Sequence, residues 1–156
     1  AAELCVAAIP ASASAHSAKH PVKPPTDWPN SEGDQAFLLG TQPGLKFDQT
    51  LLTTKAGTRI RLIFRNTDDM LHNFVLCAPG KGQDVGNAAL ALGVEGTAKN
   101  YVPDSPDVLF HTAITQPETS DTIYFITPTT PGDYDFICSF PGHSTLMKGI
   151  LRVTAK

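Results

Sequence analysis

The chain has 156 residues, a formal net charge of −3 and a hydrophobic fraction of 41%. This length supports one domain with a buried core, and so ordinary a composition excludes disorder along the whole chain. The slight negative charge argues against nucleic acid as a partner, because phosphate binding requires clustered Lys and Arg, and no apolar run of about 18 residues predicts a transmembrane segment.

The N-terminal part, residues 1–35, differs in composition from the remainder. Residues 10–29 are rich in Ala, Ser, Pro, Lys and His, which predicts an extended linker or a wrapping arm. His16 and His20 could bind a metal together on a helix, but their Pro-rich flank favours a solvated linker. The first residues contain no Met and no basic segment, which indicates a chain processed or cut from a longer one. We expect an arm over 1–35 and one folded domain over 36–156.

Short strands dominate from about residue 36. Ile60, Leu62 and Phe64 alternate with Arg side chains, and this period of two is typical of a half-buried strand. Turn residues separate further short runs of this kind, at residues 45–47, 51–53, 73–77, 108–112, 122–126, 134–138 and 149–153. An Ala- and Leu-rich run at 84–92, followed by Gly, predicts one short helix. The expected fold is all-β, an antiparallel Greek-key sandwich or barrel with one short helical insertion.

The most specific motif is Cys138-Ser-Phe-Pro-Gly-His143-Ser-Thr-Leu-Met147, on a loop before the last strand. Cys and Met are soft ligands, and two imidazoles with one thiolate and a weak axial thioether form a set typical of copper electron transfer. His72, at the start of an earlier strand, can supply the second imidazole. We therefore predict one copper ion, cycling between Cu(I) and Cu(II), bound by His72, Cys138, His143 and Met147.

Neighbouring groups are expected to support these ligands. Asn73 can cross-link its strand to the ligand loop through side-chain hydrogen bonds, and backbone N–H groups near Phe140 can donate to the Cys138 sulfur. The other two cysteines, Cys5 and Cys77, could form one structural disulfide or remain buried thiols. The sequence leaves that choice open.

The copper loop and the segment His72-Asn-Phe-Val-Leu76 resemble azurin and auracyanin, blue-copper proteins of the cupredoxin family. The likeness extends to the helical insertion, to Tyr101-Val-Pro-Asp104 and to Phe110-His-Thr112, and it covers roughly residues 45–156. It implies a cupredoxin-like fold with one type 1 copper. His72, Cys138 and His143 would be equatorial ligands and Met147 the axial one.

Three features of this sequence are compared with azurin. Azurin has Gly before its first ligand histidine, with that carbonyl as a distant fifth contact, whereas Leu71 stands here and the approach of its carbonyl is left open. The N-terminal disulfide of azurin does not carry over to Cys5 and Cys77. His111 corresponds to a surface histidine of azurin and is expected not to be a ligand.

The expected function is single-electron transfer between redox partner proteins, by an electron carrier rather than an enzyme. We expect partners to dock on an apolar surface around His143, whose ring edge should reach the surface while His72 lies deeper. Met70, Leu71, Pro141 and Leu146 would surround that edge. The protein is expected to be a monomer and to be periplasmic or otherwise exported.

Three rival functions use the same residues differently. Cys138 and His143 could form a thiolate–imidazole pair of an enzyme, although the segment offers no evident oxyanion hole and Met has no role in such chemistry. Zinc also accepts Cys and His, but Met is a poor fourth ligand for a structural zinc. Copper storage or delivery, with a role for the His-bearing arm, is the third alternative.

Overall fold

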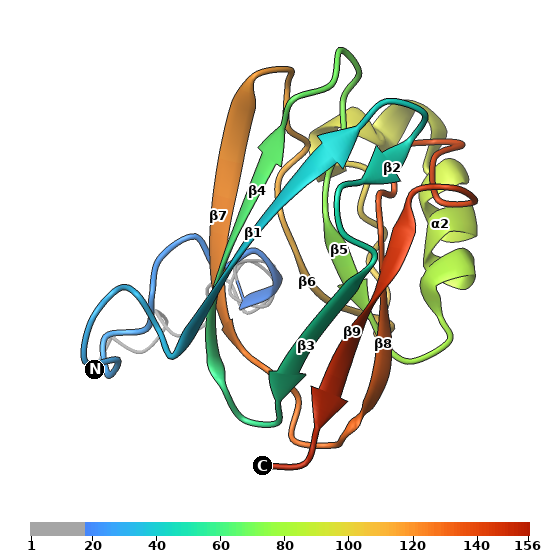
Figure 1. Ribbon diagram of the computed structural model, residues 1–156. Helices are drawn as coiled ribbons and strands as arrows, with labels where there is room; N and C mark the ends of the chain where they lie inside the picture. Colours follow the sequence, from blue (N-terminus) through green and yellow to red (C-terminus); the bar gives the residue numbers. More distant parts are fainter. Residues whose placement is uncertain (1–17) are drawn as a thin grey trace, which may run out of the picture.

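The computed structural model describes residues 18–156, whose strands form two β-sheets packed face to face (Figure 1). One sheet has the strand order β2-β1-β4-β7 and the other β3-β9-β8-β5-β6. The strands are β1 (Gln35–Gln42), β2 (Lys46–Phe47), β3 (Leu51–Lys55), β4 (Arg59–Asn66), β5 (Val75–Cys77), β6 (Val108–His111), β7 (Thr119–Ile126), β8 (Gly132–Ile137) and β9 (Lys148–Thr154). The predicted all-β sandwich is confirmed.

Two strand pairs depart from the predicted antiparallel arrangement. β1 pairs with β4, and β3 with β9, in parallel. Between β1 and β4 the chain passes through β3, which belongs to the opposite sheet. Parallel neighbours need such a crossover, whereas the prediction was an antiparallel Greek-key arrangement. The sequence pattern also does not predict β1, because its Phe and Leu residues are consecutive and Leu38 is exposed although it is apolar.

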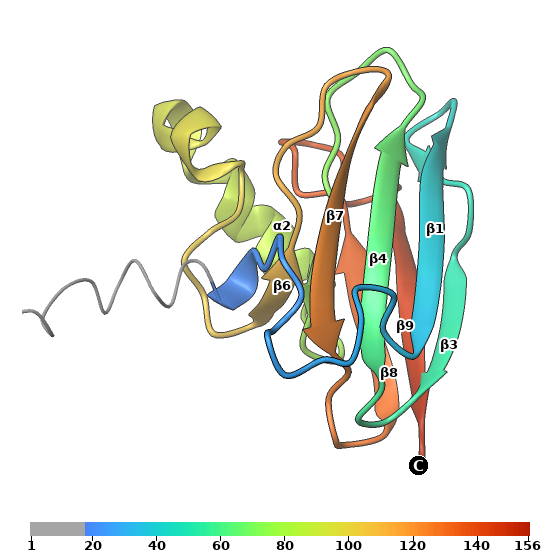
Figure 2. The same cartoon turned by 90° about the vertical axis from the view of Figure 1, so that its left-hand side faces the viewer.

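The helical insertion lies between β5 and β6 and projects from one side of the sandwich (Figure 2). It consists of α2 (Gly82–Leu90) and two short 3-10 helices, η2 (Gly93–Glu95) and η3 (Thr97–Lys99). The predicted helix is therefore present but begins earlier than expected. Asp135 on β8 accepts a hydrogen bond of 2.8 Å from the Gly82 N–H. This contact satisfies one of the free donors at the helix start.

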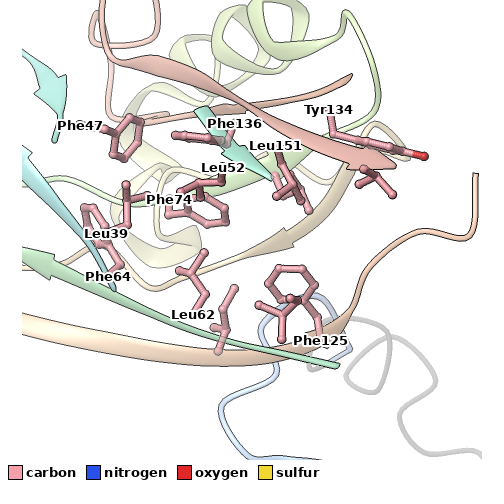
Figure 3. Close-up of a cluster of buried hydrophobic side chains, with 14 of the residues drawn as sticks. Leu39, Phe47, Leu52, Leu62, Phe64, Phe74, Phe125, Tyr134, Phe136 and Leu151 are labelled. Carbon is pink, nitrogen blue, oxygen red and sulfur yellow. The ribbon is translucent and has the colours of Figure 1, made fainter. Parts of the chain in front are cut away.

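The space between the sheets is filled by aromatic and aliphatic side chains (Figure 3). Alternation along β4 places Ile60, Leu62 and Phe64 in this core, each 1% exposed or less. Arg59 and Arg61, on the other face of the strand, point outward: Arg59 pairs with Asp34 at 2.8 Å and Arg61 with Glu32 at 3.3 Å. The predicted half-buried strand is confirmed.

Residues 18–34 pack along the first sheet at β4 and β7. Trp28 is 8% exposed and its ring meets Tyr124 edge-on at 6.2 Å. The Tyr124 N–H donates to the Pro21 carbonyl at 2.9 Å, and His20 Nε2 lies 2.8 Å from Asp121 Oδ2. The described part of the arm is thus held by the domain, and the boundary between 35 and 36 stays a prediction. Cys5 and His16 lie outside the described residues.

Candidate metal centre

Strand pairing brings the predicted ligands to one end of the sandwich. Cys138 follows β8 directly, and its N–H donates to the Met147 carbonyl at 3.0 Å, which extends the β8–β9 ladder by one step. Inside the loop, the Met147 N–H donates to the His143 carbonyl at 2.8 Å. β5 pairs with β8, so His72, three residues before β5, lies beside Cys138.

Three of the predicted ligands form a compact, buried group. The Cys138 Sγ lies 3.7 Å from His72 Nδ1 and 3.6 Å from His143 Nδ1. The ligand atoms of His72, Cys138 and His143 all lie within 4.8 Å of one another. Among the described residues, these three side chains form the cluster that could hold a metal ion. Met147 is fully buried in the same core cluster as Cys138. Its role as the axial ligand stays a prediction.

The separations between these donors suit a metal ion at the centre. Metal–sulfur and metal–nitrogen bonds of about 2.3 and 2.0 Å, as zinc makes, meeting at about 120°, would place sulfur about 3.7 Å from nitrogen. The observed distances of 3.7 and 3.6 Å agree with that value. One thiolate with two imidazoles beside a thioether is a donor set preferred by copper. The residues present therefore fit a copper ion.

Hydrogen bonds from the backbone hold the Cys138 sulfur. The Asn73 N–H donates to Sγ at 3.5 Å, and the Phe140 N–H donates as well. The Asn73 side chain donates to Ser139 Oγ at 2.9 Å and accepts from the Ser139 N–H at 2.8 Å. Both predictions, the cross-link by Asn73 and N–H donation near Phe140, are confirmed. Asn73 Nδ2 also donates to the Asn100 carbonyl at 2.9 Å, which links the loop to the helical insertion.

Burial controls the protonation of these groups. It raises the pKa of the Cys138 thiol to about 11, although the N–H groups of Asn73 and Phe140 act in the opposite direction. Burial, with the charge of neighbouring His72, lowers the pKa of His143 to about 4. At neutral pH the His143 ring is therefore uncharged and can offer a lone pair. The Cys138 proton must leave when a metal binds.

Sequence reasoning missed one polar partner of the site, Asp68. Its Oδ2 lies 2.8 Å from His72 Nε2, the ring nitrogen that faces away from Cys138. This hydrogen bond lowers the pKa of the Asp68 carboxyl below its ordinary value. The available signal was a carboxylate four residues before a predicted ligand histidine, in the turn that connects β4 to it.

The remaining predicted residues lie as follows. His143 is 4% exposed and His72 0%, so the expected order of depth is confirmed, although only a small part of His143 reaches solvent. Met70 and Leu146 are 43% and 62% exposed. His111 lies outside the ligand group, with its ring stacked on His20 at 5.2 Å.

The two cysteines outside the copper loop were left open by the sequence. Cys77 is a buried free thiol among the described residues, and burial raises its pKa to about 12. Its candidate partner Cys5 lies outside those residues, so their pairing is not tested.

Comparison with known proteins places this geometry in context. Residues 36–154 match the family described as copper binding proteins, plastocyanin/azurin family. Auracyanin-B of Chloroflexus aurantiacus is 39% identical over 115 residues, which are 70% of this chain and 48% of that protein. Azurin of Pseudomonas denitrificans is 41% identical over 87 residues, 54% of this chain and 66% of that protein. The chain thus matches about half the length of auracyanin-B.

Solved structures show the same likeness. Auracyanin A of Chloroflexus aurantiacus, described as a blue copper protein, superposes with a TM-score of 0.70 at 30% identity, over 76% of this chain and 98% of that one. Auracyanin B superposes with a TM-score of 0.68 at 37% identity, over 80% and 92%. The fold is therefore the cupredoxin fold.

Proposed function

The chain belongs to the plastocyanin/azurin family of copper binding proteins, and on this premise we propose that it carries single electrons between partner proteins through one type 1 copper ion. In this proposal the Cys138 thiolate and the Nδ1 atoms of His72 and His143 bind the ion equatorially, and the Met147 thioether binds it weakly from the axial side. The observation that carries the proposal is the buried group of one sulfur and two imidazole nitrogens, 3.6 and 3.7 Å from that sulfur.

When bound, copper would supply the one-electron couple between Cu(I) and Cu(II). The protein's own contribution is to hold the donors in one geometry for both oxidation states, which lowers the barrier to electron transfer. A backbone hydrogen bond links the Cys138 N–H to the Met147 carbonyl. The Asn73 side chain makes two hydrogen bonds to Ser139, the residue after Cys138. The full burial of Cys138 and His72 keeps water from the ligand atoms.

The same burial argues against the alternative hypothesis that Cys138 and His143 are the catalytic pair of an enzyme. A nucleophilic cysteine needs an accessible thiolate. Cys138 is 0% exposed, and burial raises its pKa to about 11, so the metal-free thiol is neither reachable nor ionised at neutral pH. These properties support a ligand that becomes a thiolate only when metal displaces its proton.

We propose that partners dock over His143, on the apolar collar of Met70, Leu71, Pro141 and Leu146. Support comes from the exposure of Met70 and Leu146, and from the Leu146 N–H, which donates to the carbonyl of the 4% exposed His143 at 3.1 Å. A small apolar contact suits a redox partner that must leave quickly. We further propose that the protein acts as a monomer in the periplasm or another exported compartment. Within residues 18–156, no helix is long and apolar enough to cross a lipid bilayer.

The visible spectrum of copper-loaded protein tests the proposal. We expect an intense thiolate-to-Cu(II) charge-transfer band that ascorbate bleaches. Cys138→Ser should abolish the band and leave the fold intact, while Cys77→Ser is the matched control, since both cysteines are 0% exposed. A band that survives in Cys138→Ser and disappears in Cys77→Ser would overturn the ligand assignment.

A further inference from the structure

One partly buried carboxylate contacts the candidate copper site from behind a predicted ligand. Asp68 Oδ2 lies 2.8 Å from His72 Nε2, with the two side chains 14% and 0% exposed. On the opposite edge of the same ring, His72 Nδ1 lies 3.7 Å from the Cys138 sulfur. We propose that Asp68 is a positioning residue of the copper centre, which sets the tautomer of His72 and favours the oxidised ion. The inference rests on the proposed function.

The first step concerns the proton on the His72 ring. A neutral imidazole has one N–H donor and one lone pair, and an ionised carboxylate can only accept a hydrogen bond. Because Asp68 faces Nε2, the proton belongs on Nε2 and the lone pair on Nδ1. That lone pair then points toward the space shared with Cys138. His72 is thereby ready to bind a cation before one arrives.

The second step concerns the position of Asp68 itself. The Asp68 N–H donates to Asn66 Oδ1 at 2.9 Å, and the fully buried Asn66 side chain donates to the carbonyls of Met70 and Thr115 at 2.7 and 2.8 Å. The Thr115 N–H in turn donates to the His72 carbonyl at 2.7 Å. These bonds tie the turn that carries Asp68 to the residue that its carboxylate contacts. The Asp68–His72 pair is therefore held by the fold and is not a loose surface contact.

The third step concerns charge. With Cys138 as a thiolate, an oxidised copper centre is a net cation and a reduced centre is neutral. A carboxylate behind His72 attracts the cation and gains nothing from the neutral form. Because His72 is fully buried and the Asp68 side chain is 14% exposed, solvent screens this attraction less than it screens a pair of surface charges. The same hydrogen bond raises the basicity of the imidazole. Both effects stabilise Cu(II) relative to Cu(I), so Asp68 should lower the reduction potential.

A plainer interpretation is that Asp68 only shapes its turn. The test must therefore measure something that turn geometry alone would not change. Asp68→Asn removes the charge, keeps the shape and retains a side-chain oxygen. Asp69→Asn removes the same formal charge from the next residue, which is exposed and whose hydrogen bonds reach Asp68 and not the His72 ring. The two variants form a matched pair.

We expect Asp68→Asn to weaken Cu(II) binding roughly 10- to 100-fold and Cu(I) binding less. Each tenfold difference between the two losses corresponds to a rise of about 59 mV in reduction potential, which voltammetry measures. Asp69→Asn should change either quantity far less. Equal shifts in the two variants, or no shift in Asp68→Asn, would overturn the proposal.

The metal-free protein provides a second readout. Ring ¹⁵N chemical shifts should report a single Nε2–H tautomer for His72 in the parent protein and a mixture of tautomers in Asp68→Ala. An unchanged tautomer in Asp68→Ala contradicts the positioning role. If Asp68→Ala does not fold, the potentials of Asp68→Asn and Asp69→Asn decide the question.

Failure of the proposed function would look different. It would appear as a parent protein without a blue band, or as a His72→Ala variant with unchanged copper affinity. In the first case the tautomer measurement on metal-free protein would still report whether Asp68 orients His72. The two hypotheses therefore fail through separate measurements.

Discussion

Cys138 and Cys77 are both fully buried, yet they lie in opposite kinds of environment. Cys77 belongs to an apolar cluster beneath α2, and its thiol donates to the nearby Val75 carbonyl at 3.7 Å. Cys138 lies where two imidazoles and two backbone N–H groups converge on its sulfur. Burial alone makes an inert thiol. Burial with converging donors and lone pairs gives Cys138 the surroundings expected of a metal ligand.

The strongest test of this contrast is the pH dependence of copper binding. Between the pKa of His143, about 4, and that of Cys138, about 11, the metal-free site holds one thiol proton and a neutral His143 ring. Copper affinity should therefore rise about tenfold per pH unit, or roughly 100-fold from pH 6 to pH 8, with one proton released. Chelator competition and a pH-stat measure both quantities. Cys77→Ser should keep the slope, and an affinity independent of pH would contradict the assignment of Cys138.

Removing the cross-link at the metal end should destabilise the protein by a mechanism absent from the Cys77 cluster. Asn73→Ala leaves Ser139 and the Asn100 carbonyl without their partner, which should lower the free energy of unfolding by about 2–4 kcal/mol. Urea unfolding of metal-free protein measures the loss. The blue band should also shift, because Ser139 is adjacent to Cys138.

The matched variant in the apolar cluster is Val85→Ala, on α2. Val85 is 1% exposed, so its truncation leaves a cavity and should cost about 1–3 kcal/mol. The spectrum of the copper-loaded variant should stay unchanged. If both variants altered the spectrum equally, the cross-link would have no special role in the ligand geometry.

Charge on the surface over the metal end should act on kinetics alone. Met70→Glu places a negative charge on the proposed docking collar of both molecules that meet in electron self-exchange. Their repulsion should slow the exchange roughly tenfold or more at low salt, with the spectrum nearly unchanged. Ile126→Glu is the control, since Ile126 is 49% exposed and Met70 43%, and Ile126 lies at the end of β7 opposite Arg59. Equal slowing in both variants would remove the collar as the electron route.

The smallest effect is expected where the N-terminal segment meets β7. Burial opposes ionisation of Asp121, but hydrogen bonds from His20 and the Ala113 N–H outweigh it and lower the carboxyl pKa. A lowered pKa contributes stability above the unfolded-state value, near pH 4, that is lost as pH falls through the folded-state value. Asp121→Asn should cost less than about 1 kcal/mol at pH 7. Melting temperatures of the parent and the variant should converge as the pH falls through the lowered folded-state pKa of Asp121, and a gap that widens there would reverse the sign.

Much of the fold follows from local patterns in the sequence. The alternation of Ile60, Leu62 and Phe64 with Arg predicts β4 and its buried face, because side chains on a strand alternate between two faces. The predicted helix is present, but its start depends on Asp135, which is remote in sequence. β1 and the two parallel pairs could not be predicted, since they depend on which strands cross between the sheets.

The copper loop shows the same division. By itself the sequence predicted the donor set, because Cys138, His143 and Met147 lie close together on one short segment and only one further imidazole was needed; the structure brings His72, Cys138 and His143 together. It also indicated the cross-link by Asn73, since that residue adjoins His72. Only the tertiary structure decided which groups stand behind the ligands. Asp68 contacts the far side of the His72 ring because the Asn66 side chain shapes the turn, accepting from the Asp68 N–H and donating to the Met70 carbonyl. Such contacts depend on the path of the backbone and on strand register, which residue types and spacing do not specify.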